Sequence, residues 1–343
     1  MSNNFYVKYL LLISLVLPFG LAQAQTAGNI HQIKKTVIGG EGSWDYLTVD
    51  AEQRKLYVSH FTQVEVLNVD THEKLGTIAG QGIHGVTLVP ERGLGYVTNG
   101  KANTVTIFDT KTLAVKGEIA VGEKPDASLY DVFSKRLFIF NSKSSNVSVI
   151  DPATGTVVGT IALEGAPEAG VSNGKGTIFV NLEDKSEIVA FDATSLKVLR
   201  RFPLAPGDAP TGLAIDLQHQ LLFSVCHNKW MMVVDAGSGA IVSKVPIGER
   251  VDGVVFDAER QIAVSSNGEG SMTVVKVVSP TEFKVVATVK TEPGAKTIAL
   301  DTKTHHLFTS TAQLGEKPAA TAENPNPKPK AVPGTFMVLE YGE

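Results

Sequence analysis

A unit of about forty residues recurs seven times along this chain, and this repeat limits the possible folds more than any other feature. Its landmark is an aromatic or apolar residue inside a short run of β-branched and aromatic residues. Successive landmarks are 39, 42, 41, 44, 41 and 44 residues apart. The seven landmarks are Tyr57, Tyr96, Phe138, Phe179, Phe223, Val264 and Phe308.

The apolar residues inside each unit alternate with a period of two. Val105 and Ile107 fall on one face of such a run, whereas Thr104 and Thr106 fall on the other. A helical repeat of this length would instead place apolar residues at i, i+3, i+4 and i+7. Each unit contains four short runs of this kind, which is typical of a propeller blade. The sequence therefore predicts an all-β fold, a seven-bladed β-propeller with four-stranded blades.

The seventh unit supplies only three strands before the chain reaches Glu343. The segment at 31–40, HQIKKTVIGG, matches the fourth strands of the other units and precedes the first unit. We therefore expect the N-terminal strand to complete the C-terminal blade and to close the ring, which leaves no open sheet edge.

Residues 1–24 have the composition of a secretory signal peptide. Lys8 precedes an apolar run from Leu10 to Leu21, and Ala22-Gln23-Ala24 provides a cleavage motif. The run is shorter than the roughly 20 residues that a membrane-spanning helix needs. We expect a periplasmic or secreted protein cleaved near Ala24, with residues 25–343 forming one propeller domain. An uncleaved membrane anchor is the alternative.

Charge and cysteine content exclude several classes of protein. There are 31 Lys and Arg residues against 35 Asp and Glu, a net charge of −4, which argues against a broad nucleic-acid-binding surface. Cys226 is the only cysteine, so no intrachain disulfide can form and stability must come from burial. Cys226-His227 also lacks the second cysteine that covalent haem attachment requires.

The motif Tyr96-Val97-Thr98-Asn99 recurs in variant form in all seven units. With it, the chain resembles the YVTN-repeat propellers, and in particular the YncE-like periplasmic group, over residues 34–343. The resemblance implies a seven-bladed fold and export. It implies no reaction, and single-stranded DNA is implied as a partner only because one member of the group is associated with it.

Two sets of aspartates, each present in five of the seven units, are predicted to be structural. They precede turns, where a carboxylate accepts hydrogen bonds from turn amides. Because they are spread around the rim, they cannot converge on one ligand. The third-strand set is Asp70, Asp109, Asp151, Asp192 and Asp235, and the first-turn set is Asp50, Asp131, Asp216, Asp257 and Asp301.

Two other sets of positions are expected to face the mouth of the central channel. The first lies twelve residues before each landmark and consists of Asp45, His84, Asp126, Pro167 (followed by Glu168), Thr211, Asp252 and Lys296. The second lies three residues after each landmark and contributes the polar residues His60, Asn99, Asn141, Asn267 and Thr311. Convergence of these groups predicts a ligand site. The alternative is that each one binds a neighbouring blade or channel water.

These positions support two functional hypotheses. The first is an exported, non-enzymatic binding or scaffold propeller that recognises an unidentified ligand or protein partner at the polar channel mouth. The second is a metal-dependent hydrolase, similar to lactonases or esterases, in which a cation polarises the substrate carbonyl. Carboxylate oxygens suit Ca²⁺ or another divalent cation. The predicted metal ligands are Asp45, Asp126, Glu168 and Asp252.

A proline-rich insertion at 312–335 interrupts the seventh unit between its second and third strands. Its composition excludes regular sheet and favours extended, hydrated backbone. It is expected to be either a lid or partner-binding arm, or a passive flap. Nucleic-acid binding would require lysines such as Lys296, Lys317, Lys328 and Lys330 to gather on one face.

Overall fold

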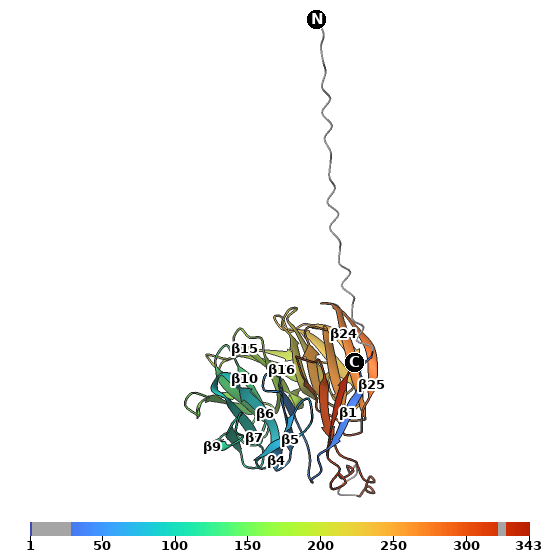
Figure 1. Ribbon diagram of the computed structural model, residues 1–343. Coiled ribbons are helices and arrows are strands. Elements are labelled where there is room, and N and C mark those ends of the chain that lie inside the picture. Colours follow the sequence, from blue (N-terminus) through green and yellow to red (C-terminus); the bar gives the residue numbers. More distant parts are fainter. Residues whose placement is uncertain (2–28, 322–326) are drawn as a thin grey trace.

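The seven repeats form seven four-stranded antiparallel sheets, which confirms the predicted propeller (Figure 1). The structure is a computed structural model, and it describes residue 1, residues 29–321 and residues 327–343. The predicted signal peptide lies almost entirely outside the described residues. Among those described, no helix is long and apolar enough to span a membrane.

Each blade contributes one strand to each of four concentric positions. The innermost strands are β2 (Leu47–Asp50), β6 (Ile83–Val89), β10 (Pro125–Asp131), β14 (Pro167–Ser172), β18 (Pro210–Asp216), β22 (Val251–Asp257) and β26 (Ala299–Leu300). The second strands are β3 (Lys55–His60), β7 (Leu94–Asn99), β11 (Arg136–Asn141), β15 (Thr177–Leu182), β19 (Leu221–Cys226), β23 (Ile262–Asn267) and β27 (Leu307–Thr311).

The third strands are β4 (Gln63–Asn68), β8 (Thr104–Asp109), β12 (Asn146–Asp151), β16 (Glu187–Asp192), β20 (Trp230–Asp235), β24 (Ser271–Ser279) and β28 (Met337–Gly342). The outermost strands are β5 (Lys74–Ala79), β9 (Val115–Ala120), β13 (Thr156–Ala162), β17 (Val198–Pro203), β21 (Ile241–Pro246), β25 (Glu282–Lys290) and β1 (His31–Val37). Two short 3-10 helices, η1 (Pro90–Arg92) and η2 (Glu183–Lys185), lie in turns.

The N-terminal strand closes the ring as predicted. β1 pairs antiparallel with β28, from His31 opposite Gly342 to Val37 opposite Met337. The blue β1 therefore lies beside the red C-terminal strands (Figure 1). β28 would otherwise present an unpaired edge.

The seven landmark residues form the core between blades. Each is at most 2% exposed. Aromatic rings from neighbouring blades pack together there, as in Tyr57 with Phe108 at 5.6 Å and Phe138 with Phe191 at 5.5 Å between ring centroids. Burying each such side chain stabilises the fold by about 2–3 kcal/mol, so the inter-blade cores hold the ring together.

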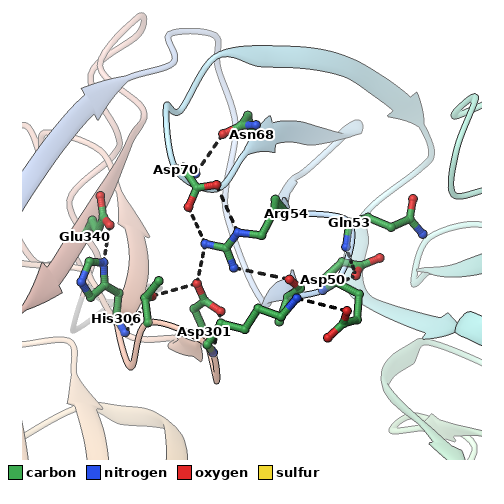
Figure 2. Close-up of polar contacts among 12 residues, drawn as sticks. Asp50, Gln53, Arg54, Asn68, Asp70, Asp301, His306 and Glu340 are labelled. Atoms are coloured by element: carbon green, nitrogen blue, oxygen red, sulfur yellow. Dashed lines mark hydrogen bonds and ion pairs between the residues drawn. The ribbon is translucent and has the colours of Figure 1, made fainter.

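Polar contacts also cross the seam between the first and last blades (Figure 2). The Arg54 guanidinium pairs with Asp70 at 2.5 Å in its own blade and with Asp301 at 2.8 Å in the last blade. Nearby, Glu340 Oε1 lies 2.7 Å from His306 Nδ1. The Asp301 side chain is fully buried, so Arg54 neutralises a charge that water cannot reach.

The aspartates predicted to be structural accept turn hydrogen bonds, with one correction. Asp109 Oδ1, for example, accepts bonds from the amides of Lys111 and Thr112. In the first blade Asn68, not Asp70, makes these bonds. The prediction for Asp70 was wrong because the turn between the second and third strands is shorter in that blade, so equal spacing selected a residue beyond the strand end.

The proline-rich insertion lies between β27 and β28, and its base forms a narrow antiparallel pair. Gly315 N–H donates to Lys330 O at 2.9 Å, and Val332 N–H donates to Gln313 O at 2.8 Å. This base packs beside the loop at Gly40, whose carbonyl accepts a hydrogen bond from Gly334 N–H.

Candidate functional site

The sheet register defines seven equivalent positions at the start of the innermost strands. In most blades the innermost-strand residue paired with the landmark lies nine residues before it, as Thr48 does for Tyr57. In blade four Val171 pairs with Phe179, only eight residues away. The position three residues further back is therefore Glu168, not Pro167. We name the resulting set the mouth ring: Asp45, His84, Asp126, Glu168, Thr211, Asp252 and Lys296.

Five mouth-ring residues from five consecutive blades form one chain of ionic contacts. His84 Nδ1 lies 2.6 Å from Asp45 Oδ2 and 3.5 Å from Asp126 Oδ1. Lys296 Nζ lies 3.6 Å from Asp45 Oδ1 and also pairs with Asp252. Residues as far apart in sequence as 45 and 296 therefore share one electrostatic environment.

The two basic groups of the mouth ring, His84 and Lys296, have raised pKa values. Burial acts to lower the pKa of His84, but the hydrogen bond to Asp45 and the charge of Asp126 outweigh it and raise that pKa. Burial likewise opposes the charge of Lys296, yet Asp252 and Asp45 raise its pKa. Asp45 itself has a lowered pKa, because Lys296 and His84 more than offset its burial.

Two other acids of the mouth ring, Asp126 and Glu168, have raised pKa values. Burial and the neighbouring Asp45 raise the pKa of Asp126 to about 6. Burial, followed by the charges of Asp126 and Asp252, raises the pKa of Glu168 to about 9. Within residues 29–321 and 327–343, no basic side chain lies within ion-pair distance of Glu168. The mouth ring therefore holds more acid than its own bases neutralise.

Thr211 belongs to the mouth ring by register but makes only backbone contacts. Its hydroxyl lies 3.4 Å from Val225 O and 3.5 Å from Val251 O, and the residue is 4% exposed. This placement gives it a role in joining adjacent blades.

The residues three positions after the landmarks do not join the mouth ring. They end the second strands. Thr311 Oγ1 donates to Pro293 O at 2.8 Å, whereas the three asparagines make hydrogen bonds to the adjoining third strand. Asn99 Nδ2 donates to Thr106 Oγ1 at 2.8 Å, and the equivalent amides of Asn141 and Asn267 do the same to Ser148 and Thr273.

His60, the remaining member of that set in the first blade, is also turned into the protein. Its ring stacks on Phe336 with centroids 4.0 Å apart, and its Nδ1 lies 3.3 Å from Glu65 Oε1. Sequence spacing correctly located the end of the strand but could not show which way these side chains turn.

Two of the four predicted metal ligands, Asp45 and Asp126, lie together in the structure, and His84 joins them. One ligand atom each from Asp45, His84 and Asp126 lie within 4.8 Å of one another. Asp252 is engaged by Lys296, and Glu168 lies outside this cluster. Two carboxylates and an imidazole suit a transition-metal ion or Zn²⁺ better than the all-oxygen set expected for Ca²⁺.

The channel below the mouth ring is narrow and changes in polarity along its length. A cavity of about 190 Å³ is lined by all seven blades, with residues of six innermost strands, including Asp252, and with Tyr46 and Ile298, which directly precede β2 and β26. Burial and then the charges of Asp126 and Glu168 raise the pKa of Tyr46 well above its usual value. The opposite mouth is apolar, with Val49, Phe256 and Leu300 among its lining residues. Charged ligands therefore have one favourable entrance.

A second pocket adjoins the mouth ring, and sequence reasoning missed it. It has a volume of about 400 Å³ and lies over the first three blades. Its wall includes Trp44, Phe61, Lys101, Lys124 and Lys143. The only sequence signal is a lysine in three separate turns of blades two and three, and nothing in the repeat pattern marks these turns as neighbours.

Comparisons with known proteins support the fold alone. No family model and no curated protein matches the chain. Among solved structures 1723 chains match, so the likeness does not distinguish one function from another. A chain from a structure described as "Crystal Structure of Mitotic Checkpoint Complex" aligns with a TM-score of 0.72 and 14% sequence identity, covering 95% of this chain and 99% of that one. This chain thus shares its fold with a chain of that structure.

Proposed function

We propose that this chain is an exported, non-enzymatic binding propeller that recognises a cationic group of its ligand or partner at the mouth ring. One observation carries the proposal: four carboxyl groups face two bases there, and Glu168 has no basic partner among the described residues. A cationic group placed between Glu168 and Asp126 would supply the missing charge, and both carboxyls would then ionise.

The states of two nucleophiles in the second strands, Cys226 and Ser266, support binding over covalent catalysis. Burial raises the pKa of the Cys226 thiol to about 12, which keeps it protonated and unreactive. The Ser266 hydroxyl donates to Lys296 O at 2.5 Å and is thereby committed to joining two blades.

Titration calorimetry with defined cations tests the proposal. We expect ethylammonium or L-argininamide to bind saturably, and Glu168→Gln and Asp126→Asn to weaken that binding about tenfold or more. Asp109→Asn, which removes a partly exposed carboxylate at the end of β8, is the matched control and should bind as the wild type does. Equal affinities in all four proteins, or no saturable binding, would contradict the proposal.

The alternative function, a metal-dependent hydrolase, is favoured by the cluster of Asp45, His84 and Asp126. Three protein ligands leave a coordination position open, and a metal held there would polarise a lactone or ester carbonyl. We expect Zn²⁺ or Mn²⁺ to raise the melting temperature if the cluster binds metal, and Asp45→Asn to abolish the effect. Metal-dependent turnover of a lactone or ester would favour this alternative, whereas stabilisation without turnover would favour binding.

Single-stranded DNA remains a proposal from the sequence resemblance. Lys296, one of the lysines considered for it, is occupied by Asp252 and Asp45. Binding of an oligonucleotide that weakens steeply as salt rises would support it.

A further inference from the structure

The pocket beside the mouth ring adds three lysines to Asp45 and His84, which it shares with the ring. We call it the lysine pocket and define it by Trp44, Phe61, Lys101, Lys124 and Lys143. Its volume of about 400 Å³ falls within the range of small-molecule sites. The three lysines come from three different turns, so the propeller geometry alone brings their side chains to one cavity.

Nearby carboxylates neutralise the three lysine ammonium groups of the pocket only weakly. Lys101 Nζ lies 4.4 Å from the Phe61 ring centroid, and no carboxylate of the described residues lies within 4 Å of it. Lys124 Nζ is 3.8 Å from Asp126 Oδ2, a loose contact. Lys143 pairs with Glu123 at 2.7 Å, but their side chains are 71% and 54% exposed, so this pair contributes little.

The aromatic walls of the pocket are held in place. The Trp44 indole N–H donates to Gly294 O at 3.0 Å, and its ring packs 6.1 Å from Phe336. Phe61 has φ of 50°, in the left-handed region that disfavours bulky residues. Each ring provides a planar apolar surface on the wall of a pocket that also contains the three lysines.

His84 links the lysine pocket to the mouth ring. Its Nδ1 is used by Asp45, while the edge containing Nε2 faces Gly100 on the pocket wall. A Cβ on residue 100 would lie 2.7 Å from both Cδ2 and Nε2 of this ring. Glycine at that position therefore leaves room for the imidazole edge to reach the pocket.

We propose that the lysine pocket binds a small organic anion, with its phosphate or carboxylate group among the lysine ammoniums and its planar part against Trp44 and Phe61. Ammonium groups attract such anions, and the desolvated aromatic walls favour an apolar planar portion. The pocket shares Asp45 and His84 with the mouth ring, but this proposal does not depend on the binding of a cation between Glu168 and Asp126.

Phenyl phosphate, benzoate and inorganic phosphate are suitable probes. In a Trp230→Phe background, Trp44 is the only tryptophan left and reports occupancy by fluorescence. We expect phenyl phosphate or benzoate to bind saturably below about 10 mM, and inorganic phosphate to bind about tenfold more weakly because it lacks the ring. The tighter of the two aromatic probes identifies the anionic group that the pocket prefers.

Variants locate the site. Lys101→Gln and Lys124→Gln should each weaken binding about tenfold, with melting temperatures near that of the parent. Lys175→Gln is the matched control, because Lys175 lies in an exposed turn at the opposite end of the channel, and it should leave binding unchanged. Phe61→Gly relieves the left-handed backbone conformation and removes the ring, so it should weaken the aromatic probes more than inorganic phosphate.

Three results would overturn the proposal. One is the absence of saturable binding of both aromatic probes up to about 10 mM. A second is an equal loss of affinity in Lys175→Gln and Lys101→Gln. The third is tight binding of a thymidine oligonucleotide that neither aromatic probe can displace, which would assign these lysines to an extended nucleic-acid surface.

Discussion

Asp45 and His84 lie on adjacent blades, 39 residues apart in sequence, and the Oδ2 of one lies 2.6 Å from the Nδ1 of the other. The contact joins the mouth ring to the lysine pocket, because His84 lines both. The protonation of His84 therefore depends on a residue of the preceding blade.

Asp45→Asn should lower the pKa of His84. Burial lowers the pKa of His84, and the charges of Asp45 and Asp126 raise it. Asparagine at position 45 removes one of these charges and leaves mainly Asp126 to counteract burial. NMR titration of the His84 imidazole in buffer containing a chelator measures this change. Asp109→Asn is the control, and an unchanged His84 titration in Asp45→Asn would show that the contact is not formed in solution.

Glu168→Gln should stabilise the protein near neutral pH. The Glu168 carboxyl has a pKa of about 9 when folded, against 4.5 as its ordinary value. The unfolded chain therefore releases this proton first, and stability falls as the pH rises from 4.5 toward 9. Glutamine does not ionise, so the variant should exceed the wild type by about 1–2 kcal/mol at pH 8, or a few degrees in melting temperature. The gap should close near pH 4, and a variant less stable than wild type at pH 8 would contradict the burial of Glu168 among acids.

Arg54→Met should loosen the seam between the first and last blades. It leaves the fully buried carboxylate of Asp301 without its guanidinium, and we expect a loss of about 2–3 kcal/mol. Denaturant unfolding measures it. Lys143→Met removes the exposed pair with Glu123 and should cost less than about 0.5 kcal/mol. Adding Asp301→Asn to Arg54→Met should recover part of the loss, and full additivity of the two changes would show that they do not interact.

Glu340→Gln should remove a pH-dependent contribution to stability from the same seam, where Glu340 contacts His72 and His306. Burial acts to raise the pKa of Glu340, but hydrogen bonds from His72 and His306 outweigh it and lower that pKa. A lowered folded pKa stabilises the protein above the unfolded value of 4.5 and loses this effect as the pH falls through the folded pKa. The variant should thus be less stable than wild type by about 1–2 kcal/mol at pH 7, with the difference shrinking below pH 4. A difference independent of pH would rule out this ion pair as its source.

The fold could be predicted from the sequence because each blade repeats the same local pattern. The landmarks from Tyr57 to Phe308 are the buried core residues, and β1 completes the last blade. The site was predicted in part. Counting back from the landmarks located six members of the mouth ring, and in blade four it gave Pro167 with Glu168 next to it. The sheet register assigns the position to Glu168, because the hairpin in blade four is one residue shorter.

The repeat pattern could not predict which way side chains point or which residues of different blades lie together. Asn99, Asn141 and Asn267 end their strands where expected, yet their amides bind within the blade. Lys101 and Lys124 were missed altogether, because turns vary freely in sequence and only the ring geometry brings them to one cavity.

The number of blades, the strand order and the closing strand follow from the repeat pattern, because alternation of apolar residues and turn chemistry act over only a few residues. Which charges meet depends on the folded ring, since the chain of contacts from Asp126 to Asp252 runs across five blades. Its strength depends on burial and on ångström-scale distances that no local pattern encodes.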